Sequence, residues 1–589
     1  MLQTKGTRLS LQPIKRKPLT QWFLGAMGGL FLVTMHTFMH NPGGSGLALP
    51  FNQATWIPLS FAIGVGLLEI CRQQHCRYTH LTLLLFVCAV LLTLPLFYPH
   101  STPEHALPRL LTVWAGWLLF VATQQFVFSH RQRQRLLWFI LLAVLIEAAL
   151  GWVQFLLLTT DNPIGYNTAA NRPYGIFQQP NVMASFMATG LVLSAYLMAR
   201  EPLYRGRWHY RHLPLLLTPV MTIPLLLVLG SRTGLWGGLI GGLMILPFLI
   251  RFAAKTQYRL WLLMCLLGGA MAFNWLSSPD TAFREMALTF DGGRTVHIPQ
   301  NLKMLQTKPL MGYGYGNFES SYIMETAHWY QQGVINTPSL PGLEHAHNEL
   351  LFWAVEGGIL PLLGLLLAAL AVYLRVKRAK AGTHLALVAI CWPIILHTQL
   401  EYPFYHSIAH FVVFIVLIYW IDNLTAKYYK KTVNHTLNIR LAACSLPLSV
   451  TLVMLSGLQS GYWLTQFERQ RPVNPVYLTN VSNPYLWQQR FDWNLHTTEL
   501  QVGAATAEFK LIESYIDWAT QQAKQWPRPS LYQNLILAYA LTEENDKRLQ
   551  LYEEATFLFP NHSFSLLTDI ESEDDVAYQH KSLPPLARE

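Results

Sequence analysis

The chain has little charge and little cysteine for its length. Of its 589 residues, 13% are charged, which is about half the fraction of an ordinary soluble domain, and 52% are hydrophobic. All six cysteines fall in or beside apolar runs, namely Cys71, Cys76, Cys88, Cys265, Cys391 and Cys444. The low charge argues against a soluble protein, and the cysteine positions argue against a disulfide framework.

Apolar runs of membrane length are abundant. A span needs about 20 apolar residues, and 13 runs approach that length. Their approximate bounds are 20–39, 54–71, 79–98, 108–128, 136–158, 180–199, 213–230, 234–250, 260–276, 350–374, 385–399, 409–421 and 441–462. The eleventh and twelfth read as one hairpin around Glu401, and the first reads as an uncleaved anchor. The runs predict an all-α polytopic membrane protein with about 13 transmembrane helices.

Basic residues alternate between the loops. With the N-terminus in the cytoplasm, the cytoplasmic loops and the leader hold 25 of the 42 Lys and Arg, and the opposite loops before residue 462 hold 7. The tail holds the other 10, with 17 acidic residues, and carries a net charge of −7. The membrane part carries +17, which we attribute to cytoplasmic anchoring rather than to nucleic acid binding. An odd number of spans puts the tail outside the cytoplasm.

The predicted domains are a membrane domain, residues 1–462, and an extracytoplasmic helical domain, residues 463–589. The membrane domain includes a large outer loop at 277–349. In the tail, a helix pair broken near Asn545 partly fits a tetratricopeptide (TPR) unit. The fitting positions are Tyr532, Leu535, Tyr539, Tyr552, Ala555 and Pro560, whereas Ile536 and Arg548 stand where small residues are expected. The tail is predicted to be TPR-like and to contact proteins, with an inert helical cap as the alternative.

Three arginines and one histidine lie on the predicted outer side: Arg172, Arg232, Arg294 and His347. Arg232 stands where two apolar runs meet, and a guanidinium placed there favours an anionic partner. The alternative for Arg232 is a side chain that snorkels to the lipid headgroups. The alternative for Arg172 and Arg294 is a loop charge that is solvated by water.

The stretch "GLEHAHNELLFWAVEGG" crowds polar groups around His347, including His345, Asn348 and Glu349. An imidazole titrates near neutrality and can accept a proton from a hydroxyl nucleophile. A zinc site and a pair of interfacial histidines without a catalytic task are the alternatives. His397 and Glu401, one helical turn apart, either line a cavity entrance or pack between helices.

Together these residues suggest an anionic leaving group and a protonated nucleophile. The charge that develops on a departing diphosphate is neutralised by a metal held on paired carboxylates or by a set of cations. The large loop has no Asp-X-Asp, and its carboxylates are scattered at Asp280, Glu285, Asp291, Glu319 and Glu325. This favours the arginines, with no metal or cofactor. "GYGYG" at 312–316 is too short for a nucleotide cradle and predicts a turn.

Four segments in order resemble the bacterial O-antigen ligases and polymerases and, most closely, the protein O-oligosaccharyltransferases that glycosylate pilins. They are "NRPYGIFQQPNVMASFMATGL", "LGSRTGL", "GGRTVHIPQNLKMLQTKPLMGYGYGNF" and "HAHNELLFWAVEGGI". Pro361 departs from the family pattern, at a position that concerns helix packing. The resemblance implies a GT-C-like membrane fold in the bacterial inner membrane and a periplasmic site.

The resemblance also implies an activity and site residues. It implies metal-independent transfer of a glycan from undecaprenyl diphosphate to a periplasmic acceptor such as a pilin. His347 matches the essential histidine, and Arg172, Arg232 and Arg294 match the arginines expected to hold the diphosphate. His345, Asn348, Glu349, His397 and Glu401 are supporting candidates. The rivals are a ligase acting on lipid A core, a glycan polymerase, and a flippase or transporter with Glu147 on its path.

Overall fold

The computed structural model describes residues 19–41, 43–201, 203, 209–276, 293–470 and 474–566. The basic leader with Lys15 to Lys17, residues 204–208 of a predicted cytoplasmic loop, and residues 277–292, which carry Asp280, Glu285 and Asp291, lie outside the described residues, as does 567–589.

Each predicted apolar run contains a helix. In chain order the helices are α1 (Thr20–Leu32), α2 (Pro50–Gln73), α3 (His80–Thr93), α4 (Pro103–Gln124), α5 (His130–Leu156), α6 (Pro180–Met198), α7 (His212–Val228), α8 (Arg232–Phe252), α9 (Lys255–Leu276), α13 (Glu349–Gly357) with α14 (Ile359–Lys377), α15 (His384–Thr398), α17 (Ile408–Thr425) and α18 (Leu437–Arg469). Among the described residues, nine helices are long and apolar enough to cross a membrane, and α7 and α15 are shorter apolar helices. The prediction of an all-α polytopic membrane protein is confirmed, and the count of thirteen spans stays a prediction.

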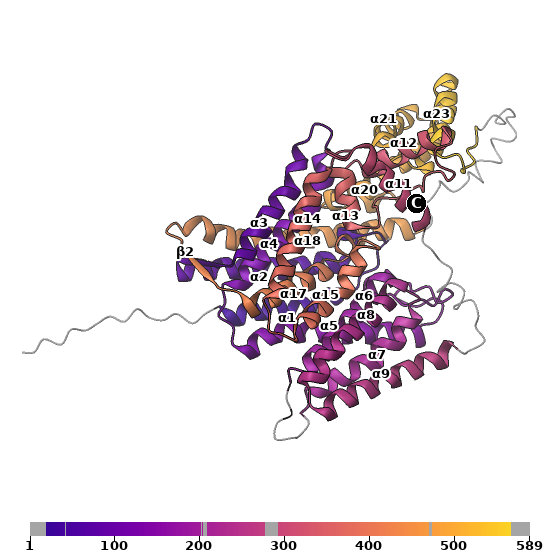
Figure 1. The fold of residues 1–589 in the computed structure, drawn as a ribbon. Coiled ribbons are helices and arrows are strands. Elements are labelled where there is room, and N and C mark those ends of the chain that lie inside the picture. The colour runs from indigo at the N-terminus through magenta and orange to yellow at the C-terminus, as the bar shows by residue number, and fades with distance from the viewer. Residues whose placement is uncertain are drawn as a thin grey trace, which may run out of the picture.

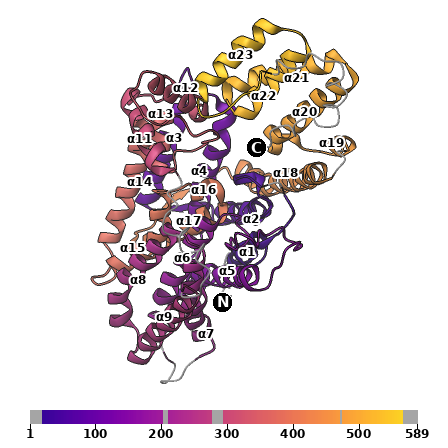
Figure 2. The ribbon, with the colours of Figure 1, turned by 90° about the vertical axis from the view of Figure 1, so that its right-hand side faces the viewer.

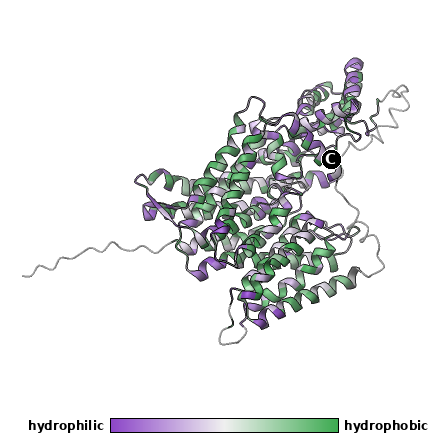
Figure 3. Ribbon diagram, viewed as in Figure 1, coloured by the Kyte–Doolittle hydropathy of each residue, from purple (hydrophilic) through white to green (hydrophobic). Residues whose placement is uncertain are grey.

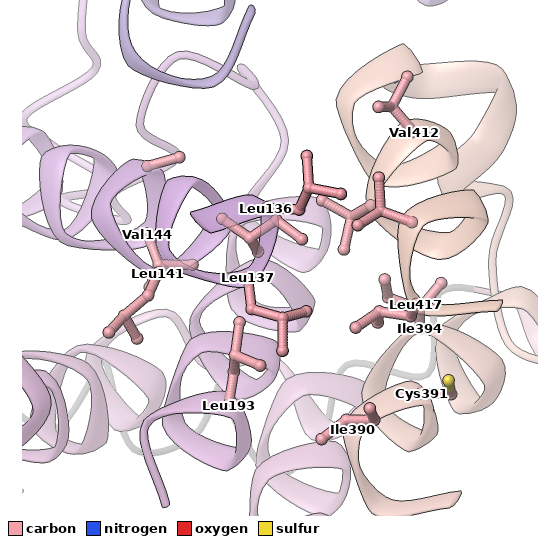
Figure 4. Packing of buried hydrophobic residues seen from close by; sticks show 14 of the residues in the cluster. Leu136, Leu137, Leu141, Val144, Leu193, Ile390, Cys391, Ile394, Val412 and Leu417 are labelled. Atoms are coloured by element: carbon pink, nitrogen blue, oxygen red, sulfur yellow. The ribbon is translucent and has the colours of Figure 1, made fainter. Parts of the chain in front are cut away.

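Among the described candidate spans, α6 is the most deeply buried, and it lies beside α8 and α15 (Figures 1 and 2). Of its most apolar stretch, 94% is buried by the neighbouring helices, and α5, α7, α8 and α15 all contact it. A helix that is apolar all round is stable only when it is enclosed in this way. Figure 4 shows part of this core, where leucines of α5 meet Leu193 of α6 and Ile390 and Ile394 of α15.

Glycines of α8 allow that helix to approach α6 closely. A Cβ atom on Gly234 would lie 2.3 Å from the Cβ atom of Ala184, and one on Gly241 would lie 2.8 Å from Val192. Inside a membrane the hydrophobic effect does not drive helices together. Small residues at such contacts stabilise the packing because they let the helix backbones approach closely. This contact fixes the first turn of α8, where Arg232 lies.

Contacts between loops sort the loops into two faces. On one face β1 (His75–Tyr78) pairs antiparallel with β2 (Tyr429–Thr432), with His75 opposite Thr432, so that two loops predicted to be cytoplasmic form one small sheet. On the other face the loop before α4 meets the large loop, because the backbone N–H of Thr102 donates to the carbonyl of Tyr315 at 2.8 Å. Each of the two contacts joins loops that the predicted alternation places on one side; the alternation itself and which face is cytoplasmic stay predictions.

The described part of the large loop, residues 293–349, contains α11 (Arg294–Thr307) and α12 (Phe318–Gln331), joined by the predicted "GYGYG" turn. The backbone N–H of Gly314 donates to the carbonyl of Glu356 at the end of α13 at 2.9 Å. Gly314 has a φ of 96°, and a Cβ atom there would lie 2.2 Å from the carbonyl oxygen of His100, so a side chain does not fit. The turn thereby fixes α13, whose other end follows His347.

The tail follows α18 without a break in that helix at residue 462. It comprises α19 (Val476–Thr479), η4 (Pro484–Trp487), α20 (Gln488–Thr506), α21 (Phe509–Gln525), α22 (Pro529–Leu541) and α23 (Asn545–Leu558). The predicted helix pair with a break near Asn545 is present as α22 and α23, and its assignment as a TPR unit stays a prediction. The tail helices lie beside α11 to α13 in Figure 2, and they are more polar than the membrane helices in Figure 3.

Candidate active site

Glu401 lies at the centre of the candidate site, in the turn between α15 and α16 (Pro403–His406). Its Oε1 accepts hydrogen bonds from the guanidinium of Arg294 and, at 3.2 Å, from the amide of Asn181. Its Oε2 lies 3.1 Å from Nδ1 of His347. One carboxylate therefore connects an arginine of the large loop with the predicted catalytic histidine, 54 positions before it in the chain.

The charges around Glu401 keep it ionised. Burial alone would raise the pKa of this carboxyl group, but the hydrogen bond and charge of His347, together with the charge of Arg294, outweigh burial and lower the pKa to about 2. A carboxylate is only an acceptor, so the proton of the shared hydrogen bond sits on Nδ1 of His347. In the neutral imidazole the lone pair is then on Nε2.

The backbone around His347 is held in an uncommon conformation. His347 has a φ of 53°, and its N–H donates to Nδ1 of His345 at 2.9 Å. Asn348 caps α13 by accepting from the N–H of Leu351, while its amide donates to the carbonyl of Gln399 at 3.0 Å. Asn348 therefore ties the histidine to the turn that carries Glu401.

The side chain of His347 is partly exposed. Its exposed fraction is 21%, and Nε2 has no hydrogen-bond partner among the described residues. An imidazole oriented through Nδ1 by a carboxylate, with no described residue bonded to Nε2, suits general-base catalysis.

The other two predicted arginines flank one turn next to this site. Arg172 donates from Nε to the carbonyl of Leu229 at 2.6 Å and from Nη2 to that of Gly230 at 3.4 Å. Burial lowers the pKa of Arg172, and the nearby charge of Glu401 opposes that shift. Arg232 begins α8 at the end of the same turn, and its side chain is exposed.

His297 and Tyr402 also belong to the site, although the sequence analysis did not single them out. The His297 ring lies 4.9 Å from that of His347 and is fully buried. Burial and the neighbouring His347 and Arg294 lower its pKa to about 4, so it is neutral. The Tyr402 ring meets His347 edge-on at 5.0 Å. The spacing of three residues from Arg294 to His297 on one helix face was the available signal.

The contacts of the other three supporting candidates differ from one another. His345 stacks on Phe352 at 4.1 Å and orients the His347 backbone, and burial lowers its pKa well below the usual value. Glu349 accepts from the indole of Trp353 and makes no hydrogen bond with His347. His397 bonds to the hydroxyl of Ser185 at 2.6 Å inside the membrane part, which fits helix packing rather than a cavity entrance. Among the described residues, no cluster of three His, Cys, Asp or Glu side chains is arranged to hold a metal ion.

Glu147 anchors the loop that carries Arg172. In the alternative of a transporter, this residue would line the transport path. Its carboxylate accepts from the backbone N–H of Ile176 at 2.9 Å and pairs with His36 at 2.5 Å. A buried charge that binds two fixed partners is a structural anchor, because moving either partner would leave that charge uncompensated.

The tail packs directly against the loop that precedes His347. Arg528, at the start of α22, binds both oxygens of Glu319 on α12 at 3.0 and 3.3 Å and also Glu344 at 2.7 Å. Tyr532, Ile536 and Phe559 of the tail share one buried cluster with Ala346, which is the neighbour of His347. The tail thus supports one wall of the candidate site.

Two protein families match parts of the chain. The family described as "Virulence factor membrane-bound polymerase, C-terminal" matches residues 385–569, and the family described as "Protein glycosylation ligase" matches residues 173–198. Both matches confirm the resemblance to the O-antigen ligase superfamily, and they indicate a membrane-bound glycan ligase or polymerase. The protein glycosylation ligase family implies, in general terms, a lipid-linked glycan donor and a protein acceptor. No curated protein matches the chain.

Proposed function

We propose that the protein transfers an oligosaccharide en bloc from undecaprenyl diphosphate to a Ser or Thr hydroxyl of a periplasmic protein, such as a type IV pilin. The observation that carries this proposal is the array of Arg294, Glu401 and His347, with Arg172 beside it and the His347 side chain partly exposed. The proposal places the site at the periplasmic face of the bacterial inner membrane, and the 173–198 match supports a protein acceptor.

The charges suit a diphosphate leaving group. Glu401 offsets part of the positive charge of Arg172 and Arg294, and the excess that remains, together with the charge of Arg232 at the adjacent turn, complements a diphosphate with a negative charge on each phosphate. Arg294 uses its Nε–H on the carbonyl of Leu400 and one Nη on Glu401, which leaves further N–H groups of its guanidinium for a donor.

The reaction is a single displacement. Nε2 of His347 receives the proton as the acceptor oxygen forms a bond to the anomeric carbon, and the bond from that carbon to the diphosphate breaks. The electron pair leaves with the diphosphate oxygen, where the arginines stabilise its charge. Glu401 stabilises the imidazolium that forms, and the configuration at the anomeric carbon inverts.

The test is co-expression of the chain with a candidate pilin and a lipid-linked glycan, followed by intact-mass measurement of the pilin. We expect a glycan-sized mass increase that is lost in His347→Ala and in Arg294→Ala, while both variants still insert into the membrane. Wild-type transfer by either purified variant would contradict the assignment. A fluorescent acceptor peptide in the same reaction distinguishes an enzyme from a transporter.

One observation favours a second acceptor. The longer match, residues 385–569, is to a polymerase family, and it covers both Glu401 and the tail. A glycan hydroxyl would then replace the Ser or Thr hydroxyl with the same residues in the same roles. Lipid-linked glycan and lipid A core, offered as acceptors in parallel with the pilin, separate the three reactions.

A further inference from the structure

A groove in the tail is lined by an unusual concentration of tryptophan. It is a small groove, about 40 Å³ in volume and partly open to solvent, between α20, α21 and the start of α22. Its lining consists of Gln489, Trp493, Trp518, Gln522, Trp526, Arg528 and Leu531. Three of these seven residues are tryptophans, whereas the whole chain has 19 in 589, so the groove is an aromatic site rather than an average stretch of surface.

We propose that this groove binds the distal sugars of the glycan while the glycan's first sugar lies at His347. This inference rests on the proposed function. Sugar rings have faces of C–H bonds that pack on aromatic rings, and hydroxyl edges that hydrogen-bond to amides. The groove offers both, because the amides of Gln489 and Gln522 lie beside the tryptophans.

The electrostatics of the groove favour an uncharged ligand. Its one cation, Arg528, is already paired with Glu319 and Glu344. A peptide acceptor bound in an extended conformation would use a strand edge, and the described residues of the tail are helices and loops with no such edge. The lining therefore fits a hydroxyl-rich oligosaccharide better than a polypeptide.

The groove also lies within reach of the candidate active site. Arg528 lines the groove and contacts Glu344 at 2.7 Å, and the three residues from Glu344 to His347 span at most about 10 Å. Trp526 and Gln525 contact His105 at the start of α4, which holds the groove against the membrane part. A single sugar at His347 is too short to fill the groove, whereas a short oligosaccharide can extend into it.

The test compares two lipid-linked donors with the full-length protein, one carrying a single N-acetylhexosamine and the other a tetrasaccharide. We expect Trp493→Ala and Gln522→Ala to raise KM for the tetrasaccharide donor about tenfold, a loss of about 1.4 kcal/mol, with KM for the monosaccharide donor unchanged. Tyr485→Ala is the matched control, because Tyr485 is an aromatic residue of the tail that is 83% exposed and outside the groove.

Three outcomes would overturn the proposal. A rise in KM for the acceptor alone would assign the groove to the polypeptide, an equal loss with both donors would show a structural or lipid-contacting role, and unchanged kinetics would leave the groove without a ligand. Failure of the wild type to transfer either donor would contradict the proposed function instead. Anisotropy of the free fluorescent tetrasaccharide, with wild type and Trp493→Ala, then still tests the groove.

Discussion

The membrane part and the tail contribute different things to the candidate site. In the membrane part, charged groups are buried and held by fixed partners, as Glu401 is by Arg294 and His347 and Glu147 is by His36. The tail contributes apolar packing and one arginine, Arg528, to the back of the loop before His347. The comparison shows that the membrane part carries the charged groups of the candidate site and that the tail packs against the loop that precedes His347.

The largest expected effect comes from the membrane side of this comparison. Glu401→Gln keeps the shape of the side chain but removes the charge that orients Nδ1 of His347 and offsets Arg294. We expect transfer to fall about 10³-fold, in the range seen when general-base catalysis is lost. The measurement is the rate of glycan transfer by the purified variant.

Asp161→Asn is the control for Glu401→Gln, because Asp161 is an exposed carboxylate in the loop before Arg172. Its transfer rate should equal that of the wild type. A wild-type rate in Glu401→Gln itself would show that His347 needs no carboxylate partner.

The spans and the tail helix pair could be predicted from the sequence, because apolar runs and helical spacing are local properties of the chain. The four predicted site residues were singled out because Arg232 stands where two apolar runs meet and because Arg172, Arg294 and His347 lie in loops on the same predicted side; their roles stay a prediction. The contact between His347 and Glu401 could not be predicted from the sequence, because it depends on how α13 packs against the turn after α15. Local spacing pairs Glu401 with His397, which instead bonds to Ser185.

Closeness in sequence was a poor guide to which side chains face His347. Glu349 is two residues away, but Asn348 begins α13 between them, and the carboxylate points back along that helix to Trp353. His297 is fifty residues away and lies against the ring. Side-chain direction follows from the helix start, and that start is set by tertiary contacts with Gln399.

In the tail, we expect the contact between Arg528 and Glu319 to contribute most to the docking of the tail on the membrane part. The Glu319 side chain is only 5% exposed, so Glu319→Ala leaves Arg528 without its buried partner and should destabilise the docked tail by about 3 kcal/mol. Limited proteolysis should release the tail faster, and the melting temperature of the purified protein should fall.

Glu344→Gln is the matched comparison, because Glu344 pairs with the same arginine but is 58% exposed. An exposed ion pair contributes about 0–1 kcal/mol, so tail release should stay close to that of the wild type. If both variants released the tail equally fast, the buried ion pair would not be what holds it.

The smallest expected effect concerns the buried carboxyl group of Glu349. This residue begins α13, directly after the loop against which the tail packs. Burial raises its pKa from 4.5 to about 8, against smaller opposing effects of Trp353 and Arg109. Because the folded state holds this proton more tightly than the unfolded state, its stabilising effect is complete below pH 4.5 and is lost as the pH rises through about 8. Between pH 6 and pH 8 the loss amounts to about 2 kcal/mol.

Glu349→Gln should therefore flatten the decline in melting temperature over that range, whereas Glu513→Gln, an exposed change on α21, should leave the decline unchanged. If the melting temperature declined equally in Glu349→Gln and in the wild type, a group other than Glu349 would be titrating over this range. A flattened decline together with an unchanged rate of tail release by proteolysis would show that the titration of Glu349 does not affect the docking of the tail.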